Sequence, residues 1–234
     1  MVDIKAFLYY RINRRALEAA ITWQFIDKYF SWLPRSKLKN KDFSIIGNNC
    51  FAGAIYHKFG LEYTSPTVWT YIFPEEYIRF LENLEWYLKQ PLEFTTVTKH
   101  PVTRKLVENM HRNYPIGILN GDVEIHFIHC KTEKQALEKW TRRVKRINFN
   151  NLFFIFSDGW EFKEELFEKF DKLPYKHKMF ISEKSQIKSG YTVFAKDLKS
   201  DDVDLRSRKF EKYVDLAKWL NGKDDFVKAK DQDL

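Results

Sequence analysis

Hydrophobic residues between positions 11 and 33 recur at the spacing of an amphipathic helix. They follow one another at alternating intervals of four and three positions: Ile12, Ala16, Ala19, Trp23, Ile26, Phe30 and Leu33. This spacing draws one apolar stripe along a helix. Basic residues flank the stripe at both ends, which is typical of a helix that lies on an anionic membrane surface. The alternative is a helix packed on the domain and followed by a solvated basic linker up to residue 41.

Beyond this segment, short apolar runs alternate with helical periodicity. We expect strands at 43–46, 92–98, 115–119, 122–130, 152–156, 178–182 and 191–195, and helices that begin after Cys50, Pro74, Thr132, Gly159 and Lys209. The continuous apolar run at 152–156 is typical of a strand buried on both faces. The alternation predicts an α/β fold: a layered domain with a mixed, partly parallel sheet flanked by helices. We expect this single domain to cover 42–222, between an N-terminal helix and basic linker at 1–41 and a frayed charged tail at 223–234.

Three short motifs define element boundaries more closely. Asn120-Gly121 predicts a tight hairpin turn. Pro74, followed by two glutamates, is typical of the first turn of a helix. Thr132 and Gln135 have the spacing of a capping box. The helix that follows should bury Leu137, Trp140, Val144 and Ile147 and expose its basic residues.

The composition narrows the class of protein. The 234 residues are 44% hydrophobic and 17% aromatic, which indicates a folded globular protein. No apolar run approaches the roughly 20 residues that cross a bilayer, and an early acid at Asp3 argues against a cleaved secretory signal. Two cysteines give neither a disulfide framework nor a zinc-type pair. We therefore expect a cytoplasmic protein. Peripheral contact to the inner face of the membrane through 11–41 stays open beside the favoured interpretation, a helix packed on the domain.

The formal net charge of +8 favours anionic partners. Nucleic acid, phospholipid headgroups, sugar nucleotides and lipid-linked phosphates all have the required charge. Nucleic acid is not expected, because the chain has no zinc finger, RNP-type strand or arginine-rich tail. An anionic glycan, sugar phosphate or lipid-linked substrate fits better, and the alternative is a lysine-rich surface with no specific partner.

Cys50 stands where a thiol could be activated. It follows the apolar run at 43–46 and a polar turn, and it precedes a predicted helix. Unpaired N–H groups and the dipole at a helix start favour a thiolate. Asn48 and Asn49, with the N–H groups of the turn, would form an oxyanion hole, and the polar loop around Ser65 would hold substrate. The alternative is that Cys50 is a small buried hydrophobe.

Ionisable residues alternate with apolar ones on the strand after the hairpin. Asp122, Glu124 and His126 share one face of this predicted strand. Buried charge costs free energy unless it is paired, so the pattern indicates chemistry. We expect His126 to be the base for Cys50 and Asp122 or Glu124 to orient its imidazole. A metal site from the same residues and His129 is not expected, because His129 falls on the opposite face.

Other residues carry weaker signals. Arg142, Arg143 and Arg146 could together hold a phosphate or carboxylate, since Arg142 and Arg146 lie one helical turn apart; the alternative is a solvated helix face. His57 should face away from Cys50, and His100, His111 and His177 have no supporting neighbours in the sequence. No nucleophile elbow, Walker A loop or dinucleotide fingerprint occurs, so the sequence identifies no cofactor.

Three blocks carry a family resemblance: SIIGNNCFAGAIYHKFGLEYTSPT, FPEEYIRFLENLEWYL and YPIGILNGDVEIHFIHCKTEKQALEKWTRRVKRINFNNLFF. In order and spacing they resemble a bacterial domain family of unknown function whose members are often labelled exopolysaccharide or capsular polysaccharide biosynthesis proteins. The resemblance covers 42–183 and implies an α/β fold and a surface-glycan context. The matching positions are Asn48, Asn49, Cys50, Ser65, Pro66, Asp122, Glu124, His126, Trp140, Arg142, Arg143, Arg146 and Asn148. The start around Cys50 is also loosely similar to papain-like thiol proteins of bacteria.

The leading functional prediction is a group-transfer enzyme of surface-polysaccharide biosynthesis. It would transfer an acyl group through a thioester on Cys50 to a glycan or lipid-linked sugar. Two alternatives stay open. A glycosyl- or phosphosugar-transferase would use Asp122 and Glu124 as acid/base or metal-binding groups. A non-catalytic subunit would dock on the membrane or on partner enzymes through 11–41.

Overall fold

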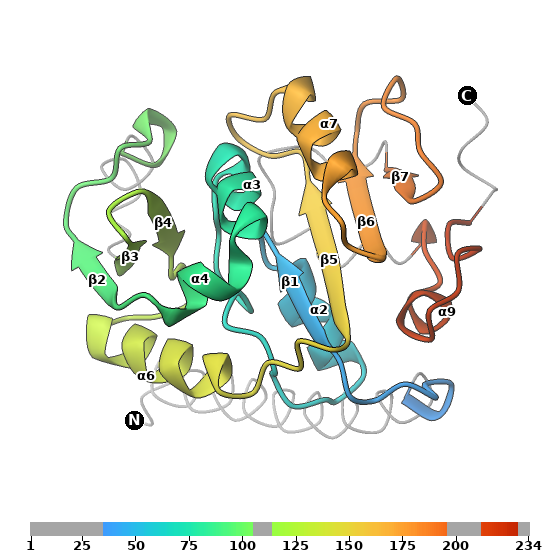
Figure 1. Cartoon of the computed structure of the whole chain (residues 1–234), viewed down its shortest axis with the longest axis horizontal. Helices are drawn as coiled ribbons and strands as arrows, with labels where there is room; N and C mark the ends of the chain where they lie inside the picture. Colours follow the sequence, from blue (N-terminus) through green and yellow to red (C-terminus); the bar gives the residue numbers. More distant parts are fainter. Residues whose placement is uncertain (1–34, 105–113, 196–211, 229–234) are drawn as a thin grey trace, which may run out of the picture.

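The computed structural model describes residues 35–104, 114–195 and 212–228 (Figure 1). The elements in these ranges are β1 (Ser44–Gly47), α2 (Phe51–Lys58), α3 (Pro74–Glu82), α4 (Leu84–Lys89), β2 (Leu92–Thr95), β3 (Ile116–Leu119), β4 (Val123–His126), α6 (Glu133–Val144), β5 (Leu152–Ser157), α7 (Glu164–Lys172), β6 (His177–Ser182), β7 (Thr192–Phe194) and α9 (Leu216–Leu220). The helix predicted at 11–33 and its membrane contact lie outside the described residues. Among the helices that are described, none has the length and apolarity needed to cross a bilayer.

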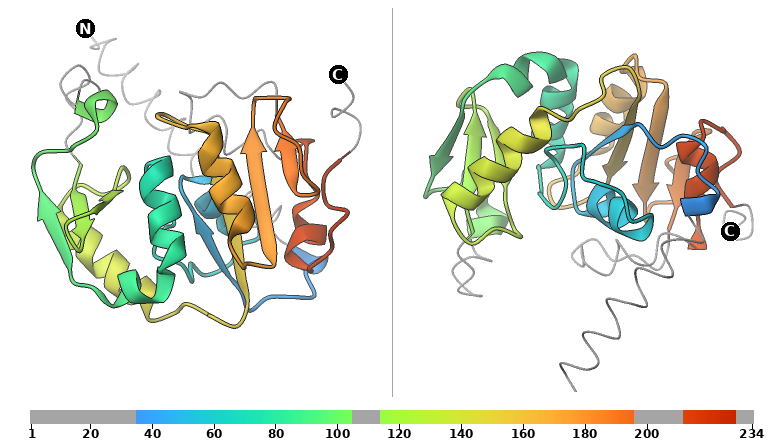
Figure 2. Two further views of the ribbon diagram at one scale, coloured as in Figure 1. Left: turned by 45° about the horizontal axis from the view of Figure 1, so that its top comes forward. Right: turned by 90° about the horizontal axis from the view of Figure 1, so that it is seen from below.

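Two sheets form the framework. One is wholly parallel, in the order β1-β5-β6-β7, and the other is antiparallel, in the order β2-β3-β4. The central strand β5 is buried from Phe153 onward, as its apolar run predicts. The predicted α/β class is therefore confirmed, with the parallel and antiparallel strands in two sheets. The antiparallel sheet lies at one end of the molecule, and β7 and α9 lie at the other (Figures 1 and 2).

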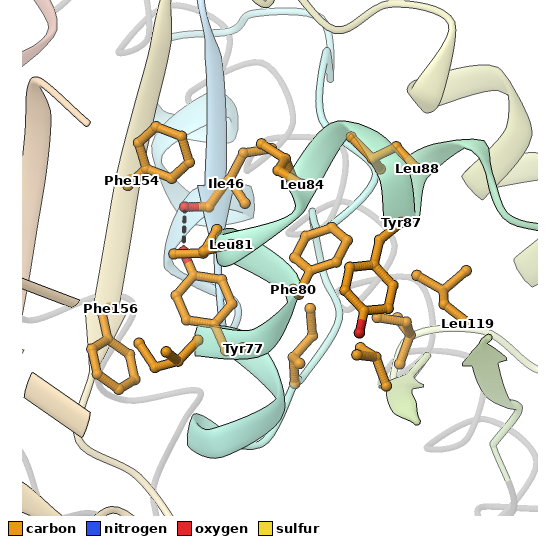
Figure 3. Close-up of a cluster of buried hydrophobic side chains, with 14 of the residues drawn as sticks. Ile46, Tyr77, Phe80, Leu81, Leu84, Tyr87, Leu88, Leu119, Phe154 and Phe156 are labelled. Carbon is orange, nitrogen blue, oxygen red and sulfur yellow. Dashed lines mark hydrogen bonds between the residues drawn. The ribbon is translucent and has the colours of Figure 1, made fainter. Parts of the chain in front are cut away.

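Alternation of side chains along the parallel strands produces two hydrophobic clusters. Ile45 and Phe153 pack on the side of α2 and α9, whereas Ile46 and Phe154 pack on the side of α3 and α7. The second cluster continues into the antiparallel sheet and α6. Figure 3 shows its centre, where the hydroxyl of Tyr77 of α3 donates to the carbonyl of Ile46 (3.0 Å). The carbonyl of Ile155 lies at 2.9 Å from the same hydroxyl and shares its proton. One core thus joins the two sheets.

An extended segment around Tyr71 lies between the sheets. Tyr71 and His126 exchange two backbone hydrogen bonds of 2.9 Å. The next residue, Ile72, donates its N–H to the carbonyl of Asn48 at 2.9 Å, just beyond β1. The segment therefore brings the end of β4 beside the carboxyl ends of the parallel strands, which is where open α/β sheets bind ligands.

The predicted local motifs are present. Asn120 and Gly121 have positive φ values of 50° and 75°, as the two central residues of a type I′ turn do, and Asp122 N donates to Leu119 O (3.2 Å) to close the turn. Pro74 occupies the start of α3. Thr132 Oγ1 accepts from Gln135 N (3.2 Å), while Gln135 Oε1 accepts from Lys131 N (2.9 Å), which is a capping box shifted by one residue.

Some predicted boundaries differ from the structure by several residues. The strand expected at 92–98 covers only Leu92–Thr95, because the chain bends at Thr96 and Val97. The strand expected at 122–130 covers only Val123–His126, because a turn closed by the bond from Cys130 N to Phe127 O (2.8 Å) follows it. The last helix begins at Leu216, where Asp215 caps it, and residues 209–211 lie outside the described ranges. The packed domain extends beyond 42–222 on both sides, since Leu38 and Phe226 are buried and Lys228 N bonds to Tyr213 O.

Candidate functional site

Polar side chains gather at the carboxyl ends of the parallel strands. All of them are buried, at the ends of strands or in the residues that follow: Asn48, Asn49, Ser157, Asp158 and Ser182. Buried polar groups are costly unless they are bonded, so their partners show what each one does. The contacts divide this region into a structural frame and two groups of reactive side chains.

The frame ties β1 to β5. Asn48 donates to Ser157 O (3.1 Å) and accepts from Ser157 N (3.0 Å). Asn49 donates to Ser157 Oγ (2.5 Å) and accepts from Phe51 N (3.0 Å). Both amides therefore hold the polar turn in place, whereas we had expected them to line an oxyanion hole. The N–H groups of Ala52 and Gly53, in the first turn of α2, have no intrahelical acceptor and could serve as donors.

The loop around Ser65 also supports β1. Ser65 Oγ contacts Thr67 Oγ1 at 3.1 Å, and Thr67 Oγ1 accepts from Gly47 N at 3.1 Å. The Ser65 side chain has no exposed surface, so its contacts fix the loop rather than face solvent.

Cys50 lies at the start of α2, as predicted, and an imidazole lies next to it. Its carbonyl accepts the first helical hydrogen bond, from Ala54 N at 3.0 Å, and its side chain is buried. The imidazole at 3.5 Å from Cys50 Sγ is that of His129, through Nε2. We had expected His126 there. The difference arises because β4 ends at His126, so the following turn directs His129 towards α2 and the strand alternation no longer applies.

Trp69 holds the His129 ring against α2. The two rings meet edge to face, with centroids 5.1 Å apart. A Cβ at Gly53 would lie 2.5 Å from the indole, so only glycine allows this approach. Trp69 has a φ of 62°, which a residue with a side chain rarely adopts. Strained backbone of this kind concentrates at functional sites.

Glu124 and His126 form a second centre. They share one face of β4, as predicted, and His126 Nε2 lies 3.3 Å from Glu124 Oε2. Both side chains are buried. Burial alone would raise the pKa of Glu124, but the adjacent His126 imidazole and hydrogen bonds from the N–H of Lys99 and the hydroxyl of Thr98 lower it to about 2. Glu124 is therefore an ionised carboxylate inside the protein.

His100 also belongs to this centre, although its neighbours in the sequence do not indicate a site. Its Nε2 lies 3.0 Å from Glu76 Oε1, and its Nδ1 lies 2.7 Å from Glu161 Oε2. Phe73 stacks on the ring with centroids 3.5 Å apart. Burial alone would lower the pKa of His100, but the hydrogen bonds to the two glutamates raise it above the ordinary value. The prediction that His100 has no supporting neighbours is therefore wrong.

A signal for this centre was present in the sequence. Glu76 stands next to Tyr77 and four residues before Phe80 on the amphipathic helix α3, so it falls on the buried side. A carboxylate on a buried helix face needs a partner. Glu161 gave no such signal, because its backbone adopts a φ of 63° that no motif indicates.

Asp122 lies apart from this centre. It precedes β4 in the hairpin turn, where its carboxylate accepts from Tyr87 OH at 2.9 Å. Its carbonyl accepts from Arg79 and from Lys99 Nζ. The expected alignment of Asp122 with Glu124 and His126 fails because the strand begins one residue later.

Arg142 and Arg143 of α6 and Arg146, just beyond its end, do not act together. Arg143 is 5% exposed, donates to Val68 O at 2.8 Å and covers the ring of Tyr63, and its burial lowers its pKa. Arg146 pairs with Glu62 at 2.8 Å, and Arg142 is exposed beside a shallow surface hollow. Arg143 follows Ala136 and Trp140 at helical spacing, so it lies on the buried face of α6. Leu137 lies off this face and is 43% exposed. The predictions that Leu137 is buried and that Arg143 is exposed are therefore wrong.

Comparison with known proteins decides the family. A model of the family described as a domain of unknown function, DUF1919, matches residues 21–221. The chain belongs to the DUF1919 family. An uncharacterized protein of Haemophilus influenzae is 33% identical to this DUF1919 chain over 193 residues, which are 79% of the chain and 87% of the relative. The expected membership of a family of unknown function is thus confirmed, and both reactive centres of the DUF1919 chain lie within the matched range. The surface-glycan context stays a prediction.

Proposed function

We propose that this DUF1919 chain is a group-transfer enzyme of cell-surface polysaccharide biosynthesis. It would carry an acyl group as a thioester on Cys50 and pass it to a hydroxyl of a glycan or lipid-linked sugar. The observation that carries the proposal is the contact of 3.5 Å between Cys50 Sγ and His129 Nε2 at the start of α2. A thiol, an imidazole base and a helix start together are the parts that covalent acyl transfer needs.

In the first step, His129 takes the proton of Cys50. The thiolate attacks the carbonyl carbon of the acyl donor, and the N–H groups at the start of α2 stabilise the oxyanion. The bond from the carbonyl carbon to the donor's leaving group then breaks, and His129 returns the proton to that group. Because Cys50 is 2% exposed and His129 is exposed, the donor would approach from the side of the imidazole.

In the second step, His129 takes a proton from the acceptor hydroxyl. The hydroxyl oxygen attacks the thioester carbonyl, an ester bond forms and the bond from carbon to Sγ breaks. Cys50 then recovers a proton from His129, which restores the starting state. Trp69 would act as a positioning residue, because its ring contacts the imidazole of His129.

The test is the pH dependence of alkylation of the folded protein, followed by mass spectrometry. An ordinary thiol loses its proton at about pH 8.5. We expect Cys50 to react well below that pH. His129→Gln should slow its reaction at pH 7 by about tenfold or more, because an unassisted thiol is only a few per cent ionised at that pH. Cys130, which is buried next to Lys139, provides the internal control. His57→Gln, on the exposed end of α2, should leave the rate unchanged.

Two results would contradict the thioester route. One is alkylation of Cys50 only after unfolding, which would make it a packing residue. The other is an unchanged rate in His129→Gln, since the imidazole would then have no influence on the thiol. Full transfer activity of Cys50→Ala on any acyl donor would exclude the route directly.

A glycosyl- or phosphosugar-transferase is the second candidate, and the buried pair of Glu124 and His126 favours it. There Glu124 would act as a base or metal ligand, without Asp122, whose carboxylate is bonded to Tyr87. This candidate predicts transfer from a sugar nucleotide that requires Mg²⁺ or Mn²⁺. Such activity should be lost in Glu124→Gln and kept in Cys50→Ala, the opposite of the thioester route.

A further inference from the structure

The centre around His126 has the composition of a metal site. One ligand atom from each of His100, Glu124 and His126 lies within 4.8 Å of the other two, and all three residues are buried. Two imidazoles and one carboxylate form a common protein ligand set for zinc, and they also suit other first-row transition metals. The distance of 3.3 Å between the Glu124 and His126 atoms is already close to the separation of ligands around one small cation.

In each of the two imidazoles, Nδ1 contacts another side chain of the protein. His100 Nδ1 bonds to Glu161, and His126 Nδ1 lies 3.3 Å from Tyr114 OH. In metal sites the nitrogen that does not bind the metal makes such a contact, which fixes the orientation of the ring. The Nε2 atoms of both rings are left to face the carboxylates of Glu76 and Glu124.

One nitrogen of this centre has no hydrogen-bond partner. His126 Nε2 is fully buried, and although it lies near Glu124 Oε2, the geometry is not that of a hydrogen bond within the described residues. Glu124 Oε2 instead accepts from Thr98 Oγ1 at 2.7 Å. Since a buried imidazole nitrogen without a partner is unfavourable, a cation at this point would satisfy it.

The charges also fit a dication. Three carboxylates contact the two imidazoles: Glu76, Glu124 and Glu161. One ammonium, Lys99 Nζ, lies 2.5 Å from Glu76 Oε1. With both imidazoles neutral, as metal ligands must be, the centre has two uncompensated negative charges. A dication would neutralise them.

We propose that His100, Glu124 and His126 bind one transition-metal dication of the Zn²⁺ type, through Nε2 of each imidazole and a carboxylate oxygen. The proton on Nε2 of His100 leaves to solvent when the metal binds, and Glu76 keeps its ion pair with Lys99. Two nitrogen ligands favour Zn²⁺ and Co²⁺ over Mg²⁺ and Ca²⁺. Three protein ligands leave a position open for water or substrate. Metal binding at this site requires no thioester on Cys50.

The experiment is a titration of the full-length chain, stripped of metal with a chelator, with Co²⁺ and then Zn²⁺. We expect one Co²⁺ per chain, visible bands of a site with nitrogen and oxygen ligands, and no near-ultraviolet band from a thiolate. Zn²⁺ should displace the Co²⁺, and Mg²⁺ should not. Zn²⁺ should also raise the melting temperature of the wild-type chain.

Matched variants locate the metal. His126→Gln and Glu124→Gln should weaken Zn²⁺ binding by more than about 100-fold, since loss of an outer-shell partner alone costs about 10–100-fold. The exposed counterparts His57→Gln and Glu93→Gln should bind as the wild type does. Cys50→Ser should also bind normally, which separates this site from the thiol.

Three results would overturn the proposal. The first is the absence of a Co²⁺ spectrum and of any Zn²⁺-dependent melting shift at millimolar metal, which would identify the centre as a hydrogen-bonded network. The second is unchanged affinity in a folded His126→Gln variant. The third is a thiolate band that disappears in Cys50→Ser, which would assign the metal to Cys50 and His129. If the Gln variants do not fold, the Co²⁺ spectrum and the Zn²⁺-dependent melting shift of the wild-type chain still show whether it binds the metal.

Discussion

At the scale of single residues, the contact between Cys50 and His129 depends on a glycine that takes no part in the proposed chemistry. Gly53 leaves the space that the Trp69 indole occupies, and Trp69 in turn contacts His129. The position of the imidazole beside Cys50 therefore depends on a missing methyl group on α2. This dependence can be tested without any knowledge of the substrate.

Gly53→Ala should displace Trp69 and loosen the contact between His129 and Cys50. The added Cβ would lie 2.5 Å from the indole, which overpacks the site. We expect a loss of stability of about 1–3 kcal/mol by urea unfolding, as overpacked cores show, together with slower alkylation of Cys50 at pH 7. Gly190→Ala is the control, because its Cβ would meet nothing within 4 Å. An unchanged alkylation rate in Gly53→Ala would remove Trp69 from the list of positioning residues.

Glu161→Gln tests the outer shell of the proposed metal site. The carboxylate bonds to Nδ1 of His100 and would orient its Nε2 towards the metal. A neutral amide orients the ring less strongly, so we expect Zn²⁺ affinity to fall by about 10-fold or more, within the usual range for such partners. A competition titration with a chromophoric chelator measures this. Glu164→Gln, an exposed residue at the start of α7, should bind Zn²⁺ as the wild type does.

At the scale of elements, helix α6 shows how a basic residue can belong to the core. Arg143 lies on the buried stripe with Ala136 and Trp140, whereas its neighbour Arg142 is exposed. The guanidinium bonds to Val68 O, in the segment that leads to Trp69. Arg143 therefore connects α6 to the segment before Trp69, which contacts His129 beside Cys50.

Arg143→Ala and Arg142→Ala should differ sharply in stability. Removal of the buried guanidinium leaves Val68 O without its donor and opens a cavity beside Tyr63. We expect a cost of about 2–4 kcal/mol for Arg143→Ala, and less than about 0.5 kcal/mol for the exposed Arg142. Chemical denaturation of both variants provides the comparison. Equal stabilities would show that the guanidinium is not part of the core.

At the scale of the whole molecule, the second core cluster should make folding sensitive to alkaline pH. Burial raises the pKa of Tyr77 well above its ordinary value, and burial together with the hydrogen bond to Asp122 raises that of Tyr87 to about 12. In the unfolded chain, tyrosine ionises at about pH 10. Above that pH the unfolded state loses protons that the folded state keeps, so stability present below pH 10 is lost as the pH rises.

We therefore expect the free energy of unfolding to fall between pH 9 and pH 11. Each buried tyrosine should contribute about 1.4 kcal/mol for each pH unit above its unfolded pKa. Urea unfolding across this range measures the slope. Tyr77→Phe should be less stable at neutral pH, because the carbonyls of Ile46 and Ile155 lose their donor, but its slope above pH 10 should be smaller. A slope equal to that of the wild type would exclude Tyr77 as the group responsible.

Periodicity and turn chemistry were enough to predict the α/β class, the hairpin and the buried central strand. These features follow from local rules that hold wherever the residues occur. The partners at the site required contacts between distant segments. His129 reaches Cys50 only because β4 stops at His126, and His100 meets Glu76 and Glu161 across 24 and 61 positions of sequence. No spacing in the chain encodes such pairings.

The segment between the two sheets supports three histidines in succession. Trp69 contacts His129, the backbone of Tyr71 pairs with His126, and Phe73 stacks on His100. Alternate residues of the segment 69–73 thus serve both centres. If a ligand at one centre shifts this segment and so changes the affinity of the other centre, a ligand at the other centre changes the affinity of the first by the same factor. Deuterium exchange at the amides of Tyr71 and Ile72, which bond to His126 and Asn48, would report this linkage from the middle of the segment.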